Sequence, residues 1–177
     1  MRHFAILLAT VLPLTAYAAG SDSTSPPKPT ATTTECKKGE IFDAKTKTCT
    51  DAKSGALDDD ARFDAVRELA YAKRYDEART MLAAMTEGET DRVLTYRGFL
   101  ARKTGDVPAG MAFYAAALDA NPDNILARSY MGQALVEAGD TAAAARQLTE
   151  IRARGGNGTW AEASLAQAVG SGQTLDY

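Results

Sequence analysis

The sequence predicts an all-α protein, an α-solenoid made of three helix pairs and closed by one capping helix. Three observations lead to this prediction. Residues 58–170 carry apolar residues at helical spacing among Ala, Leu, Arg and Glu. Glycines recur after 34 residues, since Gly98 returns as Gly132 and Gly105 as Gly139. A glycine-rich break then precedes one more helical stretch.

The N-terminus has the features of an export signal. Met1-Arg2-His3 gives a positive start, residues 4–14 are nearly all apolar, and Ala16-Tyr17-Ala18 has the small-x-small pattern of a cleavage site. The apolar run is shorter than the roughly 20 residues of a membrane span. We therefore expect residues 1–18 to be a signal peptide, with cleavage after Ala18 or one residue later. An uncleaved anchor is the alternative. The mature protein would be periplasmic or secreted, without a membrane span.

Two short segments are expected between the signal and the helices. Residues 19–35 are mostly Ser, Thr, Pro and Ala, a composition that predicts a disordered linker. Residues 36–49 begin and end with cysteine, and in an exported protein Cys36 and Cys49 most simply form a disulfide that holds a small loop. A redox-active pair is disfavoured, because redox motifs usually leave two residues between the cysteines. Free thiols are the other alternative.

The helical part, residues 58–170, divides into repeats at 59–90, 91–124 and 125–158, a capping helix at 159–170, and a tail at 171–177. In the second repeat, Gly98 allows the paired helix to approach closely, and we expect Gly132 to do the same in the third. Asp106 follows a turn glycine and is placed to cap the next helix. Thr159 and Glu162 read as a capping box at the start of the last helix.

These motifs resemble the tetratricopeptide repeat, with its small residue, Gly-Asp turn, small-x-x-x-aromatic face at Gly110 and Tyr114, and closing proline at Pro122. The resemblance covers 59–170 and is strongest in the second and third copies. It implies antiparallel helix pairs whose first helices line a concave, peptide-binding face. The order of parts also resembles small exported bacterial proteins of this family that carry an N-terminal two-cysteine segment.

The resemblance also implies which residues line the concave face. The lining positions are Phe63, Arg67, Ala70 and Tyr71 in the first copy, Arg92, Thr95, Phe99, Arg102 and Lys103 in the second, and Ser129, Gln133 and Val136 in the third. Aromatic side chains with a positive stripe suit an acidic segment that carries an apolar anchor. We expect Phe99 to receive that anchor outside the inter-helix core. The alternative is that the arginines are only the solvated side of amphipathic helices.

The composition argues against several function classes. With 20 basic and 23 acidic residues the net charge is −3, which argues against nucleic acid as a partner. The single histidine, His3, lies in the signal, so the mature chain has no imidazole for a catalytic triad or a histidine metal site. The carboxylate cluster Asp58-Asp59-Asp60 is explained better by helix capping than by a metal. We expect no enzyme, no cofactor and no metal.

Two functions remain. The leading one is an exported scaffold or adaptor that binds a protein or peptide in the bacterial cell envelope through its concave face. The alternative is an envelope- or carbohydrate-targeting module, in which the loop from Cys36 to Cys49 binds and the repeats act as a spacer.

Overall fold

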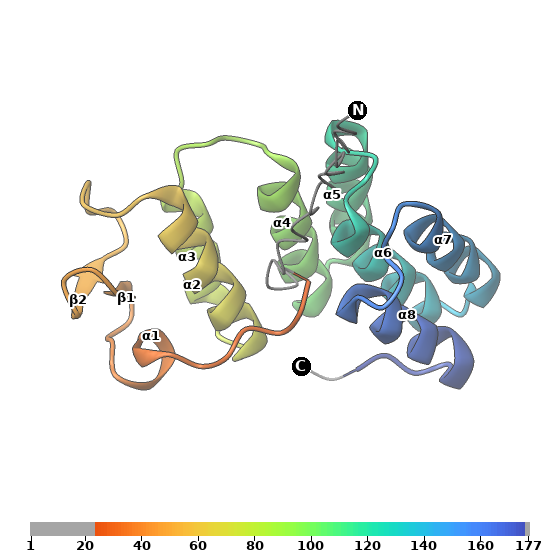
Figure 1. The fold of residues 1–177 in the computed structure, drawn as a ribbon, viewed down its shortest axis with the longest axis horizontal. Coiled ribbons are helices and arrows are strands. Elements are labelled where there is room, and N and C mark those ends of the chain that lie inside the picture. The colour runs from red at the N-terminus through yellow and green to blue at the C-terminus, as the bar shows by residue number, and fades with distance from the viewer. Residues whose placement is uncertain (1–23, 176–177) are drawn as a thin grey trace, which may run out of the picture.

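The computed structural model describes residues 24–175, which form eight helices and a two-stranded sheet (Figure 1). The predicted signal peptide, residues 1–18, lies outside the described residues, as do residues 19–23 of the expected linker and the last two residues of the tail. The elements are α1 (Ala31–Thr34), β1 (Glu40–Asp43), β2 (Thr48–Asp51), α2 (Asp59–Tyr71), α3 (Tyr75–Ala84), α4 (Asp91–Lys103), α5 (Val107–Ala120), α6 (Ile125–Glu137), α7 (Thr141–Ala153) and α8 (Trp160–Ser171).

The helices pack against one another in chain order. The close pairs are α2 with α3, α4 with α5 and α6 with α7, and α8 packs on both α6 and α7. The first helices of the pairs also touch in series, from α2 to α4 to α6. Figure 1 shows this succession from the yellow helices α2 and α3 to the blue helix α8. The mostly helical fold predicted from the spacing of apolar residues is confirmed.

Side-chain caps explain where five of the seven long helices begin. Asp58, Asp106, Asn124, Asp140 and Thr159 each accept a hydrogen bond from a backbone N–H of the following first turn. Such a bond satisfies one of the amides that have no partner within the helix. The cap predicted at Asp106 is therefore present, at 3.1 Å from the amide of Ala109.

The capping box predicted at α8 is only half formed. The hydroxyl of Thr159 accepts from the amide of Glu162 at 3.2 Å, as expected. The carboxylate of Glu162 instead accepts from the guanidinium of Arg152 at 2.7 and 2.9 Å, and the amide of Thr159 donates to the carbonyl of Gly156. An ion pair with the preceding helix replaces the second bond of the box.

The repeated glycines sit at close helix contacts, with one difference from the prediction. A Cβ on Gly98 would lie 2.6 Å from the ring of Tyr114, on the paired helix α5. A Cβ on Gly132 would lie 2.6 Å from Leu165, which belongs to α8 and not to the paired helix α7. Gly132 therefore leaves room for α8 to pack closely, because the fully buried side chain of Leu165 fills the space where a Cβ would lie.

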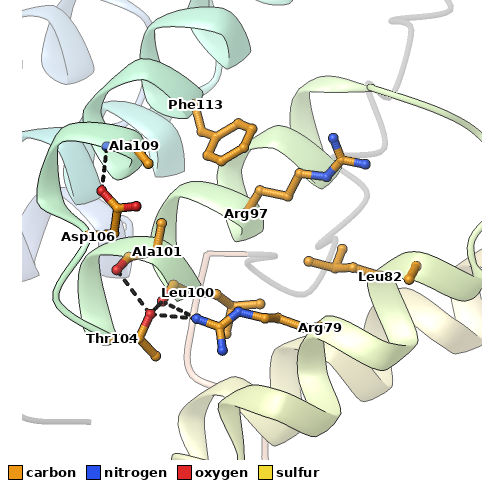
Figure 2. Close-up of a pocket in the computed structure, with 10 residues that line it drawn as sticks. Arg79, Leu82, Arg97, Leu100, Ala101, Thr104, Asp106, Ala109 and Phe113 are labelled. Carbon is orange, nitrogen blue, oxygen red and sulfur yellow. Dashed lines mark hydrogen bonds between the residues drawn. The ribbon is translucent and has the colours of Figure 1, made fainter.

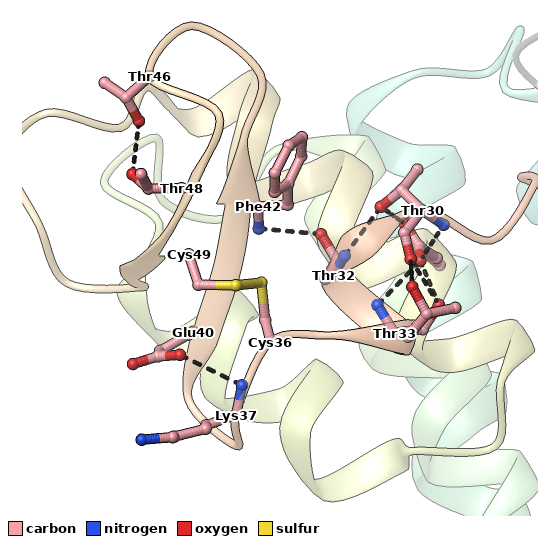
Figure 3. Close-up of a disulfide and its surroundings, with 12 residues drawn as sticks. Thr30, Thr32, Thr33, Cys36, Lys37, Glu40, Phe42, Thr46, Thr48 and Cys49 are labelled. Atoms are coloured by element: carbon pink, nitrogen blue, oxygen red, sulfur yellow. Dashed lines mark hydrogen bonds between the residues drawn. A yellow bond between two sulfur atoms is a disulfide. The ribbon is translucent and has the colours of Figure 1, made fainter.

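The two-cysteine segment forms a disulfide-linked β-hairpin that packs on α2, the first long helix. β1 and β2 pair antiparallel, with Phe42 opposite Cys49, and the predicted Cys36–Cys49 disulfide is present with Cα atoms 5.5 Å apart (Figure 3). Ile41 and Leu57 belong to the same buried cluster as Val66 and Leu69 of α2. The hairpin therefore shares a hydrophobic core with the helices.

The expected disorder of residues 19–35 is not found where the structure describes them. Thr30 caps α1, and Thr32 is buried with 4% of its surface exposed. Figure 3 shows α1 beside the hairpin, with the hydroxyl of Thr32 accepting from the amide of Phe42 at 3.1 Å. The carboxylate of Glu68 on α2 supplies the attachment that the composition did not reveal. Among the helices of residues 24–175, none is long and apolar enough to cross a membrane.

Candidate functional site

Where α2, α4, α6 and α8 come together, the partly exposed side chains of Phe63, Arg67, Tyr71 and Trp160 form a surface, which we call the inner face. At this surface and in the core beneath it, aromatic side chains from four helices meet. They are Tyr71 of α2, Tyr96 and Phe99 of α4, Tyr130 of α6 and Trp160 of α8. Tyr71 is stacked on Phe99 with ring centroids 6.0 Å apart, and it meets Trp160 edge-on at 6.0 Å. The hydroxyls of Tyr71 and Tyr130 are 2.9 Å apart. The helices expected to line a concave face therefore do bring their aromatic residues together.

A hollow of about 530 Å³ opens beside this cluster, at the N-terminal ends of α2, α4 and α6. Three of the predicted lining residues, Phe63, Arg67 and Arg92, border it. Phe63 meets Tyr96 edge-on at 5.3 Å, and the guanidinium of Arg92 lies 4.9 Å from the Phe63 ring. The rest of the lining is polar except for Ile125: Asp60, Asp64, Asp91, Asn121, Asp123 and Asn124.

The arginines expected to form a positive stripe are already bound to carboxylates. Arg92 pairs with Glu87 at 2.5 Å and with Asp60 at 2.7 Å. Its hydrogen bonds hold the pKa of Glu87 below the usual range and raise the pKa of Arg92 itself. Arg102 pairs with Glu137 at 2.7 Å, and only 1% of its side chain is exposed. The charge expected to attract an acidic partner is therefore largely neutralised within the chain.

Three predicted lining residues instead join neighbouring helices. Thr95 is 1% exposed, and its hydroxyl accepts from the side-chain amide Nδ2 of Asn124 at 3.1 Å. Ser129 and Gln133 are both 0% exposed. Ser129 donates to the carbonyl of Ala161 at 2.8 Å, and the Gln133 amide donates to the hydroxyls of Ser129 and Ser164. The resemblance placed these positions on the concave side, but α8 covers Ser129 and Gln133, and the start of α6 contacts Thr95.

The expectation that Phe99 lies outside the core is wrong. Phe99 is 0% exposed and belongs to the largest hydrophobic cluster, between the rings of Tyr71, Tyr96 and Tyr130. Lys103, from the same predicted set, lies with its ammonium 5.8 Å from the Phe99 ring. Ala70 and Val136 are buried as well.

A turn of the chain itself, at Thr24 and Ser25, lies against the inner face. The carbonyl of Ser25 accepts from Arg67 Nη2 at 2.7 Å. The hydroxyl of Thr24 accepts from the amide of Ala161, in the first turn of α8, at 3.2 Å. Thr24 is only 5% exposed. The sequence analysis missed these contacts. The only signal was for the neighbouring residues Thr30 and Thr33, since Glu68 on the apolar side of α2 is a buried carboxylate that requires donors.

A second hollow, of about 450 Å³, lies between α3, α4 and α5 (Figure 2). Its walls are mainly apolar, with Leu82, Leu100 and Phe113, and Arg97 extends into the space between them. Arg79 reaches from α3 to the carbonyl of Leu100 and the hydroxyl of Thr104. We call it the outer cavity. None of the predicted lining residues borders it.

The chain matches no protein-family model, no curated protein and no solved structure. What the fold itself defines is the class: a disulfide-containing helical protein whose successive helices pack against one another, as in a helical repeat protein. Over residues 24–175 no group of three or more carboxylate, cysteine or histidine side chains is arranged to hold a metal ion.

Proposed function

We propose that the protein is an exported scaffold of the tetratricopeptide-repeat type, and that its inner face binds an extended segment of a protein in the cell envelope. The pairing of α2 with α3, α4 with α5 and α6 with α7 supports a short α-solenoid, with α8 as its cap. The glycine contact between α4 and α5 and the recurrence of Gly98 after 34 residues support the same assignment.

One observation carries the proposal. Arg67 and the first turn of α8 already hold a segment that belongs to no helix or strand, since Ser25 and Thr24 of the same chain are bound there. A surface that binds a non-helical segment of its own chain through a carbonyl and a hydroxyl offers groups that other non-helical peptides can use. This mode needs no secondary structure in the ligand, unlike a helix in a groove.

The charges of the hollow modify the type of partner that we expect. Its rim carries Asp60, Asp64, Asp91 and Asp123 beside two arginines, of which Arg92 is already paired twice. Phe63 provides apolar surface at the same place. We propose a segment with an apolar side chain and uncharged or basic neighbours, in place of the acidic segment expected from the sequence.

The test uses a charge reversal on the hollow and a matched reversal elsewhere. Peptides that bind the mature chain are selected from a displayed library, and their affinities are measured by fluorescence anisotropy. Asp64 borders the hollow, and 79% of its side chain is exposed. Asp76 on α3 is 85% exposed and also pairs with an arginine three residues later. Both can be changed to Lys with little effect on the fold.

We expect Asp64→Lys to weaken the selected peptides by about tenfold or more, which corresponds to about 1.4 kcal/mol, while Asp76→Lys leaves their affinity unchanged. Equal affinities for the two variants would remove the inner face as the binding site.

The alternative function, envelope targeting through the two-cysteine loop, is favoured by one observation. Five lysines on and around the hairpin are exposed: Lys37, Lys38, Lys45, Lys47 and Lys53. Deleting the loop would be a poor test, because Ile41 and Leu57 are part of the helical core. The variant Lys37→Glu/Lys38→Glu keeps that core. If the loop targets the envelope, this variant should lose co-sedimentation with cell-wall sacculi or anionic vesicles while still binding the selected peptides.

Export rests on the signal-peptide prediction. N-terminal sequencing of the protein from a periplasmic extract should return Ala19, or Gly20 after cleavage one residue later. A sequence beginning at Met1 would contradict the proposed localisation.

A further inference from the structure

We propose that residues 24–29 are an intramolecular ligand of the inner face, and that a partner segment binds by displacing them. We call residues 24–29 the strap and residues 30–34 its anchor. This inference rests on the proposed function and specifies its regulation and the chemistry of the partner.

The anchor is firmly attached to α2. The carboxylate of Glu68 accepts from the amide and the hydroxyl of Thr30, both at 2.7 Å, and from the amide and the hydroxyl of Thr33. Glu68 is 6% exposed, so these four bonds replace the water that a carboxylate would otherwise bind. Arg74 donates to the carbonyl of Thr33 at 3.1 Å. The disulfide hairpin follows directly and fixes the other end of the anchor.

The strap makes a different kind of contact. Its first two residues bind α8 and α2, through the hydroxyl of Thr24 and the carbonyl of Ser25. Pro26, Lys28 and Pro29 are exposed. A proline-rich segment favours the extended polyproline conformation, with a rise of about 3.1 Å per residue, so residues 26–29 span roughly 12 Å between the anchor and the turn at Thr24 and Ser25. Thr24 and Ser25 hold the N-terminal end of the strap, and the proline-rich residues 26–29 connect that end stiffly to the anchor.

This arrangement makes the strap a tethered competitor. A short tether gives its tip an effective concentration in the millimolar range. A free segment must compete with that concentration before it can reach Arg67 and the amide of Ala161. The groups it has to replace are a hydroxyl acceptor for the α8 amide and a carbonyl for Arg67. The partner is therefore expected to be an extended segment with Ser or Thr directly before the residue whose carbonyl meets Arg67.

The test measures binding of the strap's own sequence in trans. The probe is a fluorescein-labelled peptide of residues 19–30, Ala-Gly-Ser-Asp-Ser-Thr-Ser-Pro-Pro-Lys-Pro-Thr. The protein is the mature chain, as wild type and as a strap variant that combines Thr24→Val, Pro26→Gly and Pro27→Gly. These changes remove the hydroxyl and loosen the spacer but leave the inner face intact. Thr149→Val, at an exposed threonine of α7, is the control for the same loss of a hydroxyl.

We expect the strap variant to bind the probe about tenfold more tightly than wild type, or better, and Thr149→Val to behave as wild type. Adding Arg67→Gln to the strap variant should reverse the gain, which assigns the probe to the same site. Circular dichroism checks that each variant is folded. An unchanged affinity in the strap variant would overturn the proposal.

A second readout does not depend on any ligand. The amide of Ala161 donates to Thr24, so its hydrogen exchange should accelerate in Thr24→Val and stay unchanged in Thr149→Val. Equal exchange in all three proteins would show that the strap does not occupy the face. If the wild type is a dimer and Thr24→Val is a monomer, the strap binds the inner face of a second copy, and the proposal of an intramolecular ligand is wrong. The proposed function fails separately, if Asp64→Lys has no effect on the display-selected peptides.

Discussion

Gly98 shows how one missing side chain sets the distance between two helices. Its nearest neighbours on α5 are Tyr114, which is fully buried, and the carbonyl of Gly110, which a Cβ on Gly98 would approach to 3.0 Å. Neither can move without disturbing the cluster around Tyr130, whose ring centroid lies 6.3 Å from that of Tyr114. The sequence repeat identified Gly98 correctly because a helix contact at this spacing leaves no room for a Cβ.

We predict that Gly98→Ala lowers the free energy of unfolding by about 1–3 kcal/mol, the usual cost of overpacking. Gly170 on α8 is the control, because a Cβ there would have no neighbour within 4 Å. Gly170→Ala should be neutral or stabilise by less than about 1 kcal/mol, since Ala favours a helix. Denaturant melts of the two variants measure both values. Equal stabilities would mean that α4 and α5 are farther apart than described.

Asp59 gives the molecule a pH dependence. Burial alone would raise the pKa of this carboxyl, but hydrogen bonds from Thr86, Arg62 and the amide of Glu87 outweigh burial and hold the pKa below its usual 3.8. These bonds tie the start of α2 to the segment between α3 and α4. A lowered pKa in the folded state favours folding above the unfolded value.

We therefore predict that this contribution is fully present at neutral pH and is lost as the pH falls below about 3.8 through the lower pKa of the folded state. Asp59→Asn should be less stable than wild type at pH 7, and the difference should narrow toward pH 3. Urea melts across this range measure it. A difference that does not change with pH would show that the charge of Asp59 contributes nothing.

The candidate site shows what single positions could and could not predict. The resemblance to the tetratricopeptide repeat placed Phe63, Arg67 and Tyr71 on one side of the first helix; Phe63 and Arg67 do border the hollow, and Tyr71 does stack on Phe99. Periodicity within one helix says nothing about partners from distant parts of the chain. Arg102 is neutralised by Glu137, which follows 35 residues later, and Ser129 is covered by α8.

At the scale of elements, the hairpin is an end piece for the helices. Its buried Ile41 and the following Leu57 pack on α2 together with the short helix α1. Terminal repeats need such covering, because their outer face would otherwise expose apolar surface. The disulfide prediction followed from cysteine number alone, whereas the packing on α2 depends on contacts that composition does not encode.

We predict that Cys36→Ser/Cys49→Ser lowers the free energy of unfolding by about 3 kcal/mol in the chain-entropy model for a loop of this length. Thermal melts with and without reducing agent measure it. Reducing agent should destabilise the wild type and leave the double variant unchanged. If reduction leaves the melting temperature of the wild type unchanged, the hairpin contributes nothing to the stability of the helices.

The segment 24–34 marks the limit of composition as a guide to order. Its Ser, Thr and Pro residues form no core, which is why disorder was expected. It is ordered because two charged side chains of α2, Arg67 and Glu68, bind its backbone and hydroxyls. These hydrogen bonds join residues about 40 positions apart in the sequence, so the composition of the segment itself does not predict them.

At the scale of the whole molecule, the first and last long helices meet. Tyr71 of α2 contacts Trp160 of α8 and shares a hydroxyl contact with Tyr130 of α6. Thr24 adds a hydrogen bond to α8 from a position 137 residues earlier. The contacts of α2 and Thr24 with α8 therefore bound the inner face on the side of α8. They depend on the rotation between successive helix pairs, which the 34-residue repeat in the sequence does not predict.

The central claim is that partners bind on the inner face, and Trp160 tests it most directly. It is the only tryptophan of the chain, so its indole N–H gives a single, readily assigned signal in a ¹H–¹⁵N spectrum. When the mature chain is titrated with a display-selected peptide, we predict that this signal shifts in step with binding, because Trp160 packs against Tyr71 on that face. A peptide that binds while the Trp160 signal stays in place, with the shifts gathered at Ala109 and Phe113 of the outer cavity, would contradict the account.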